Sequence, residues 1–399
     1  MPESSLIISH CEIFKCLFYH KVLSSTEISA FTGKSIPYTT KVLNELIQAG
    51  FIEEKGLANS SGGRKPVNYS LVAETYYMVS VAMDQYTVQM VIIDFQGQFV
   101  TEVANFDFRL YDASPMDLAE LIAGYLSDAR FKPAAMVITM PGFVDTDLGV
   151  NYSFLKASKD QTLVGYLQEQ FELPVFIDNN STAIALGEYK FGVASHEKNV
   201  MVLNLGWGIG LGMIVDSKIF RGNNGLAGEF SHIPLFNNGQ LCSCGKRGCL
   251  ETEASLQAIT RNAQEGINKG EVTSLENFDI LDADVILSEA AKGDLFAVRL
   301  ISEAAYQVGR GLSILIHLMN PAAVVLSGKG SEVGKIWMAP IQQAINEHCI
   351  PKLTEYTDFY ISDMQATAQL IGGAALLVEN FGLPLQEKLT RLNDLSISK

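Results

Sequence analysis

The sequence lacks a hydrophobic segment long enough to cross a membrane, since its longest apolar runs, such as Ala322–Leu326, have the length of one strand. Its N-terminus lacks the basic region and apolar stretch of a secretory signal. Cysteine is scarce, with six residues in 399, yet three of the six fall within 242–249. We therefore expect a cytoplasmic protein with no membrane partner, in which clustered cysteines bind a metal instead of forming disulfides.

Basic residues are also in deficit. The chain has 29 Lys and Arg against 44 Asp and Glu, a net charge of −15, which argues against a protein that coats nucleic acid nonspecifically. Residues 1–75 contain seven residues of each sign, so the remainder carries the whole −15. A neutral N-terminal part on an acidic body is compatible with DNA contact by that part alone.

The first fifty residues predict three helices. Apolar positions at helical spacing favour a helix over 5–19, and a second helix is expected over 25–33. A third is expected over 35–50, with Ser35 as N-cap and Gly50 at its end. The segment from Thr26 to Gly50 therefore has the pattern of a helix-turn-helix.

A short strand at 51–52, a glycine-rich tip at 60–66 and a returning strand at 67–72 predict a wing. Residues 56–63 and 72–76 are expected to form the hinge to the rest of the chain. In a winged helix-turn-helix, the second helix of the motif lies in the major groove. The candidate DNA contacts are Ser35, Tyr38, Thr39, Lys41, Asn44, Arg64 and Lys65. The alternative is a small dimerisation or capping domain that never meets DNA.

From Tyr77 onward, strands alternate with helices, and the scheme restarts at residue 200. Strands are expected at 79–83, 88–94, 99–105, 134–140, 175–178, 200–205, 210–215, 217–221 and 324–327, and helices at 117–131, 163–171, 182–191, 253–268, 284–292, 294–319 and from 372. This pattern predicts a two-lobed α/β body with a cleft between the lobes. The expected domains are 1–72, 73–190 and 191–399.

One segment has the composition of a metal site. It contains three cysteines and one histidine, a usual set for a closed tetrahedral zinc site. Its members are His232, Cys242, Cys244 and Cys249. Glu229 and Glu251 bracket this cluster, so we expect the metal to shape a pocket for a further ligand.

A run in which glycine alternates with other residues, 205–212, is a weak signal for a phosphate-binding loop. The alternative is a close-packed hairpin. The run is not a Walker A motif, since no Gly-Lys-Ser/Thr follows, and its spacing does not fit a dinucleotide fingerprint.

Together these motifs resemble the ROK family, which groups repressors and sugar kinases. The resemblance covers almost the whole chain and is strongest over Gly225–Glu251, with support from the Pro141–Asp145 loop and from Arg221-Gly222. The N-terminal module looks like the regulator branch, which includes xylose- and N-acetylglucosamine-responsive repressors. The resemblance implies an actin-like ATPase (ribonuclease H-like, sugar kinase) body that forms homodimers or homotetramers.

The resemblance also implies roles for individual residues. The four zinc ligands would be His232, Cys242, Cys244 and Cys249. The sugar-binding residues would be Gly142, Asn179, Asn180, Glu229, His232 and Glu251. Carboxylates suit this task because they are strong acceptors that orient several hydroxyl groups.

The kinase chemistry of the family is not matched. Asn180 stands where the kinases have a catalytic aspartate, and an amide cannot accept a proton near neutral pH. The first phosphate loop is Asp84–Thr87, without glycine, and Trp207 occupies the second loop. Near the adenine site, Lys329 adds a side chain between two glycines.

We therefore expect a kinase-inactive, sugar-responsive transcriptional regulator of carbohydrate genes, and specifically a repressor, whose partners are operator DNA and a sugar or sugar derivative. The first alternative is an active sugar kinase with a regulatory DNA-binding head. The second is a DNA-free scaffold, or a regulator controlled by a phosphotransfer protein, without a sugar ligand.

Overall fold

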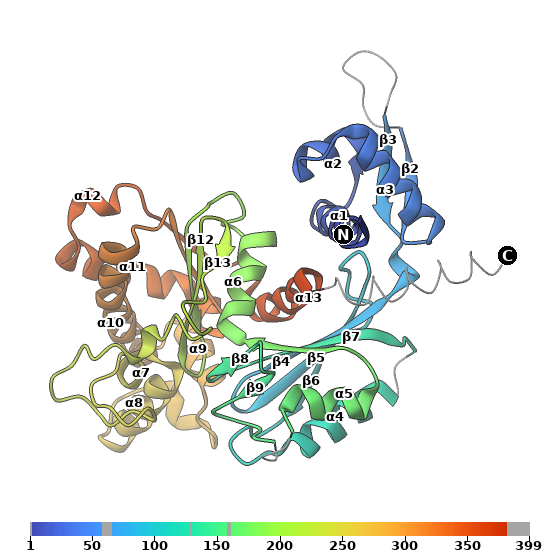
Figure 1. The fold of residues 1–399 in the computed structure, drawn as a ribbon. Helices are drawn as coiled ribbons and strands as arrows, with labels where there is room; N and C mark the ends of the chain where they lie inside the picture. Colours follow the sequence, from blue (N-terminus) through green and yellow to red (C-terminus); the bar gives the residue numbers. More distant parts are fainter. Residues whose placement is uncertain (1, 58–65, 128–129, 158–160, 381–399) are drawn as a thin grey trace. The chain divides into compact units, whose positions relative to one another are not determined.

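The computed structural model describes residues 2–57, 66–127, 130–157 and 161–380 (Figure 1). The chain divides into two compact units. The first unit contains residues 1–140, 146–178 and 373–399, and the second contains 141–145 and 179–372. This division differs from the expected three domains, because the N-terminal module and the first lobe fall in one unit and the boundary lies at 178–179 rather than at 190.

The N-terminal module is a winged helix. It consists of α1 (Pro2–His20), α2 (Ser25–Thr32), α3 (Ile36–Gln48) and a sheet of β1 (Leu23–Ser24), β3 (Val67–Leu71) and β2 (Ile52–Leu57), in that order (Figure 1). A capping box between Ser24 and Glu27 begins α2, and Ser35 with Pro37 begins α3.

The segment expected to be a hinge, 72–76, is held by hydrogen bonds on two sides. On the side of the winged helix (the head), the Val72 amide donates to the Phe51 carbonyl at 2.9 Å, and the Thr75 hydroxyl donates to the Gly50 carbonyl at 3.0 Å. On the other side, toward the α/β lobe that begins at Tyr77, the Phe95 amide donates to the Ala73 carbonyl at 3.0 Å. The hinge prediction for 72–76 is therefore wrong, because the backbone of this segment is paired. The other expected hinge, 56–63, lies mostly outside the described residues.

The first lobe is built on a five-stranded sheet of order β10-β7-β4-β5-β6. Its strands are β4 (Tyr77–Met83), β5 (Thr87–Asp94), β6 (Ala104–Asp107), β7 (Pro133–Met140) and β10 (Val175–Asn179), and its helices are α4 (Pro115–Ser127) and α5 (Leu163–Phe171). The strand expected over 99–105 lies at β6 instead, and Phe99 makes only an isolated bridge to Ile93. The short strands β8 (Val144–Asp145) and β9 (Val150–Asn151) follow β7.

The second unit is built on another five-stranded sheet, of order β13-β12-β11-β14-β15. The strands are β11 (Val200–Leu205), β12 (Ile209–Val215), β13 (Lys218–Ile219), β14 (Ala323–Ser327) and β15 (Asp358–Ile361). Alternate residues of β11 enter different cores. Val200 and Val202 pack with α6 (Asn180–Phe191) on one face, and Met201 and Leu203 join a larger core on the other.

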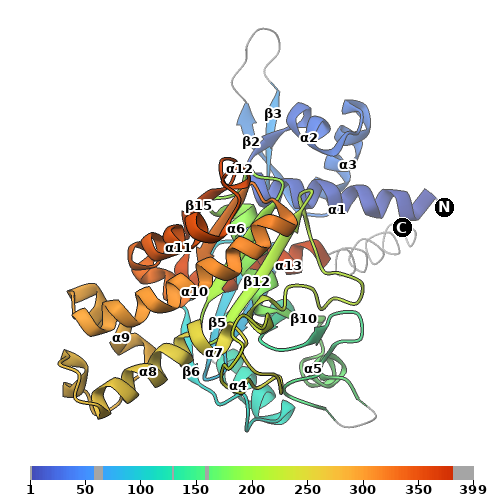
Figure 2. The same ribbon diagram turned by 90° about the vertical axis from the view of Figure 1, so that its left-hand side faces the viewer.

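Helices enclose that larger core. They are α7 (Glu251–Ala254), α8 (Leu256–Asn268), α9 (Ala283–Lys292), α10 (Leu295–Met319) and α11 (Gly334–His348), with α12 (Pro351–Thr354) nearby and α13 (Ala368–Asn380) ending the described chain. α10 packs along α11 (Figure 2). The expected helix over 253–268 is two helices, because Ser255 caps α8 by accepting from the Ala258 amide at 3.1 Å. None of the helices in the described part of the chain has the length and hydropathy needed to cross a membrane.

The sequence pattern did not predict α11 or β15. Pro340 lies inside α11, and proline is a signal against a helix interior. β15 forms one end of the sheet order and is only partly buried, so its apolar pattern is weak.

Close packing of α6 on β12 generates a prediction. A Cβ on Gly212 would overlap the Ala185 side chain and the Ser181 carbonyl. We expect Gly212→Ala to destabilise the second unit by about 1–3 kcal/mol, because the backbones must separate. Gly124→Ala is the matched control: it lies in α4 with open space around it, and it should stabilise by about 0.4–1 kcal/mol. Denaturant unfolding measures both, and an unchanged midpoint for Gly212→Ala would contradict the packing argument.

Candidate metal centre and ligand site

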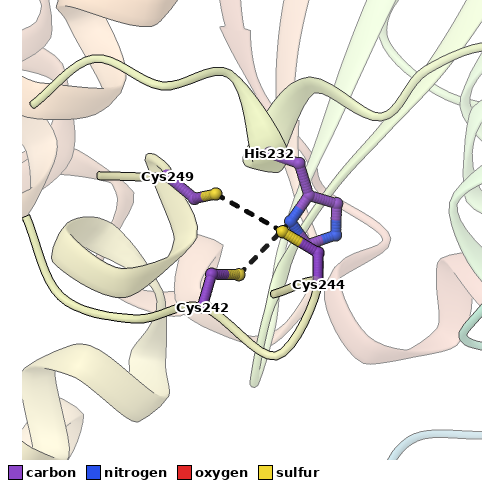
Figure 3. Close-up of side chains that lie close together, drawn as sticks. All are labelled: His232, Cys242, Cys244 and Cys249. Carbon is purple, nitrogen blue, oxygen red and sulfur yellow. Dashed lines mark hydrogen bonds between the residues drawn. The ribbon is translucent and has the colours of Figure 1, made fainter. Parts of the chain in front are cut away.

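The cysteines and the histidine of the candidate metal site converge on one point (Figure 3). Their ligand atoms all lie within 4.8 Å of one another. His232 Nδ1 lies 3.4 Å from Cys242 Sγ, and Cys244 Sγ lies 3.6 Å from Cys249 Sγ. Two thiolates bound to one tetrahedral zinc are separated by about 3.8 Å, and a sulfur and a nitrogen by about 3.5 Å. These two pairs have the spacing of a zinc site, and pairs as far apart as 4.8 Å need only a small approach to share one ion.

Two tight turns bring the cysteines together. The Gly245 amide donates to the Cys242 carbonyl at 2.9 Å, and the Cys242 amide donates to the Lys246 carbonyl at 2.8 Å. Gly248 has φ +76, and a Cβ there would overlap the Phe236 carbonyl. The spacing Cys-Ser-Cys-Gly-Lys-Arg-Gly-Cys is thus a requirement of the fold as well as of the ligand set.

The electrostatics of the cluster also favour a cation. Burial and the neighbouring thiols of Cys244 and Cys242 raise the pKa of the Cys249 thiol to about 12. Three thiolates this close repel one another unless a positive charge lies among them. The donor set and the geometry therefore fit a metal.

The two carboxylates expected to bind a ligand lie beside this cluster. Glu229 Oε2 is 3.7 Å from His232 Nε2, the ring nitrogen not directed at Cys242, and Glu251 Oε1 is 4.0 Å from Cys242 Sγ. Burial raises the pKa of Glu229, the His232 ring opposes that shift and Glu251 adds to it. The metal cluster and the carboxylates form one continuous polar site.

The glycine run belongs to the same site, but its role is packing. A Cβ on Gly208 would lie 2.8 Å from Glu251 Oε2, and one on Gly210 would overlap the Ser181 hydroxyl. Leu205 pairs with Ile209 across the hairpin. The structure therefore favours the close-packed hairpin over the phosphate loop.

Asn179 and Gly142, two further sugar candidates, are in direct contact. Asn179 Nδ2 donates to the Gly142 carbonyl at 3.1 Å, and Asn179 Oδ1 accepts from the Ser181 amide at 2.8 Å as the N-cap of α6. Asn180 Oδ1 accepts from the same amide at 2.9 Å. All six sugar candidates lie in the second unit. The hairpin of β11 and β12 borders two groups of them, because its turn residue Gly208 lies at Glu251 and Gly210 of β12 lies at Ser181, next to Asn180.

The two loops that resemble kinase phosphate loops are closed by the chain itself. Asp84 Oδ1 accepts from the amides of Tyr86 and Thr87 at 2.6 and 2.7 Å. The carbonyls of Gly206 and Trp207 accept from Leu256 and Gln257 at the start of α8, both at 3.2 Å. A carboxylate thus occupies amides of the first loop, and the second loop turns carbonyl oxygens toward the first turn of α8.

On the winged helix, Ser35, Lys41 and Asn44 are exposed on α3, and Tyr38 is half-buried. Thr39 is fully buried, so its prediction as an outward-facing DNA contact is wrong. The reason is helical spacing: Thr39 lies on the same face as the core residues Val42, Leu43 and Leu46. Arg64 and Lys65 lie outside the described residues.

An exposed apolar side chain of α3 is absent from the candidate DNA contacts. Ile36, in the first turn of this helix, is 48% exposed. Its position directly after the N-cap was the available signal, but apolar residues are usually assigned to the core. A thymine methyl group is the kind of base edge that such a side chain contacts.

The fold and the site are those of a class of proteins that contains sugar kinases and related repressors. The model of the ROK family matches residues 90–380, and the chain belongs to this family. It is 27% identical over 377 residues to a xylose repressor from Caldicellulosiruptor bescii, covering 92% of this chain and 94% of that protein.

Two solved structures represent the two branches of the family, the regulators and the kinases. A ROK family transcriptional regulator, a homologue of the Escherichia coli MLC protein, is 26% identical with a TM-score of 0.81, and the match covers 96% of this chain and all of that one. A ROK family glucokinase from Streptomyces griseus, solved with glucose and AMPPNP, is also 26% identical with a TM-score of 0.66, but the match covers 75% of this chain and 98% of that one. The regulator thus matches more of this chain than the kinase does.

The metal cluster generates a second prediction. We expect the purified chain to contain bound metal and Cys249→Ser to retain much less of it after dialysis, because only three of the four protein ligands of the closed shell remain. Cys11→Ser is the matched control, since Cys11 lies in α1 of the first unit and is not a member of the cluster. Elemental analysis after dialysis measures metal content. Equal metal in Cys249→Ser and Cys11→Ser would remove Cys249 from the ligand set.

Proposed function

We propose that this chain is a DNA-binding transcriptional repressor that responds to a sugar and has no kinase activity. The observation that carries the proposal is a winged helix joined to a ROK body in which the chain's own groups occupy the loops that correspond to the kinase phosphate loops. The same body contains a polar site of two carboxylates and a histidine. The full-length similarity to a xylose repressor supports it.

The sugar would be held in the second unit. Glu229 and Glu251 accept hydrogen bonds from its hydroxyl groups, and His232 uses Nε2 toward the sugar while Nδ1 faces the cysteines. Asn180 contributes an amide, and the Asn179–Gly142 contact holds the neighbouring loop in place. Carboxylate acceptors favour a neutral, polyhydroxylated ligand over an anionic one.

The metal would be zinc, held by His232, Cys242, Cys244 and Cys249. Zinc bound by four protein ligands has no open position, so its contribution is to fix the ligands in place. It would orient the His232 ring, and through it the Glu229 side chain, for sugar binding. Zinc thus performs no catalytic step here.

Three features oppose phosphoryl transfer. Asn180 cannot act as a general base, the amides of Tyr86 and Thr87 are occupied by Asp84, and Trp207 lies in the second loop. Losing the base alone costs about 10²–10⁴-fold in rate. The loss of the phosphate contacts comes in addition, so no useful turnover is expected.

DNA binding and sugar binding would be linked. If a sugar lowers the affinity for operator DNA by some factor, the operator must lower the affinity for the sugar by the same factor. A homodimer or homotetramer would present two or more winged helices to the half-sites of an operator. We propose release of the operator on sugar binding as the regulatory response.

The first test of this function is DNA release by sugars. A duplex selected by the chain from a random library is titrated in the presence of xylose, glucose and N-acetylglucosamine. We expect at least one sugar to raise the melting temperature and weaken DNA binding, and Glu251→Gln to abolish both effects. Glu253→Gln, also in α7 and likewise acidic, is the matched control. If no sugar in this panel or a wider one shifts melting, or if Glu251→Gln responds like the control, the sugar-sensor proposal fails.

The second test addresses the kinase alternative. We expect no sugar-dependent ATP turnover by the chain, and none by Asn180→Asp, because restoring a carboxylate leaves the amides of the first loop occupied. A coupled ADP assay over the same sugars measures this. Sugar-dependent turnover that Asn180→Ala abolishes would identify the chain as a kinase.

A further inference from the structure

The winged helix and the first lobe share one aromatic cluster. Phe95, in the turn after β5 of the lobe, is fully buried. Its ring stacks on Phe14 of α1, with centroids 4.5 Å apart and planes inclined by 17°. It also packs against Phe51 at 6.0 Å and Tyr76 at 5.6 Å. A residue of the body thus completes the hydrophobic core of the head.

Polar contacts fix the same turn. Lys21 Nζ, just after α1, donates to the Gln96 carbonyl at 2.6 Å, and Gln96 Nε2 donates to the Leu71 carbonyl at 2.6 Å. Asp94 Oδ1 accepts from the Gln96 and Gln98 amides, both at 2.9 Å, which holds the turn in shape. Gln96, the residue next to Phe95, therefore binds the winged helix at Lys21, just after α1, and at Leu71, the end of β3.

A second anchor comes from the opposite end of the chain. Glu379, near the end of α13, accepts from Lys15 Nζ at 2.7 Å and from the Tyr19 hydroxyl at 2.8 Å, both on α1. Burial, together with the Glu379 charge, raises the pKa of the Tyr19 hydroxyl well above its usual value, so this hydroxyl remains a donor. Lys15 and Glu379 are each about one-third exposed, so this pair orients α1 more than it stabilises it.

The helix that carries Glu379, α13, is shared by the two units. Its first residues, up to Gly372, belong to the second unit, and its residues from Gly373 belong to the first. One helix therefore runs from the unit that contains the sugar candidates to the contact with α1 of the head. The start of α13 and Glu379 therefore belong to one continuous helix.

We propose that Phe95 and Glu379 are positioning residues for DNA binding. Phe95 fixes the winged helix to the first lobe so that the two act on DNA as one rigid body, and Glu379 couples the head to α13. This proposal rests on the proposed function, since it assigns a route from sugar to DNA.

Hydrogen exchange without DNA tests the docking by itself. In Phe95→Ala, amides of α1 and α3 should exchange faster than in the unsubstituted chain, while metal content remains unchanged. Phe106→Ala is the matched control, because Phe106 lies on β6 of the same lobe and packs against Tyr125. Phe95→Leu, which keeps an apolar side chain, should restore part of the protection. Equal exchange in Phe95→Ala and Phe106→Ala would overturn the role of Phe95.

Titration with the selected duplex tests the consequence. Phe95→Ala should bind DNA about tenfold more weakly, and Glu379→Ala should lose about tenfold of the release caused by the active sugar, with sugar-induced melting shifts intact. Glu355→Ala is the control for Glu379→Ala, because Glu355 pairs with a lysine at 2.6 Å, but within one turn of the second unit and away from α13 in the sequence. Sugar release by Glu379→Ala equal to that of the control would overturn the coupling. If the unsubstituted chain binds no DNA, the proposed function fails, and the exchange experiment still decides the docking.

Discussion

The close approach of α6 to β12 is the constraint on which the ligand site of the second unit depends. Gly210 and Gly212 leave space for Ser181 and Ala185, and Gly208 leaves space for the Glu251 carboxylate. Any side chain at these positions would push apart the segments that carry the candidate sugar contacts. The metal cluster then supplies what packing cannot, because a short loop rich in polar and charged residues has no core of its own to hold His232 and Glu229 in place.

The proposed absence of kinase activity depends on two loops of the chain. A phosphate loop needs backbone amides that point at an anion. Here Asp84 occupies two such amides in the first loop, and the carbonyls of Gly206 and Trp207 face the first turn of α8. Both loops are thus closed turns in this structure, and the two carboxylates lie beside the cysteine cluster. The proposed sensor role requires both features, a ligand site and the absence of phosphoryl transfer.

Much of this organisation could be predicted from local patterns. The helices of the winged module, the alternation of strands and helices, and the ligand spacing around Cys242 each depend on residues close in sequence. Two predictions failed because a local pattern was misinterpreted. Thr39 was assigned outward although it shares a face with Val42 and Leu46, and α11 was missed because Pro340 obscured a helix that packs along α10.

The sequence by itself determined the family, the set of three cysteines and one histidine that could hold a metal, and the asparagine at position 180, because these depend on residue identity and short spacing. Only the tertiary structure decided that the expected hinge at 72–76 is paired and that Phe95 belongs to the core of the head. It also decided that Glu379 meets Lys15 across 364 positions of sequence. No local pattern encodes such contacts, because the partners meet only when hydrophobic burial has folded the chain.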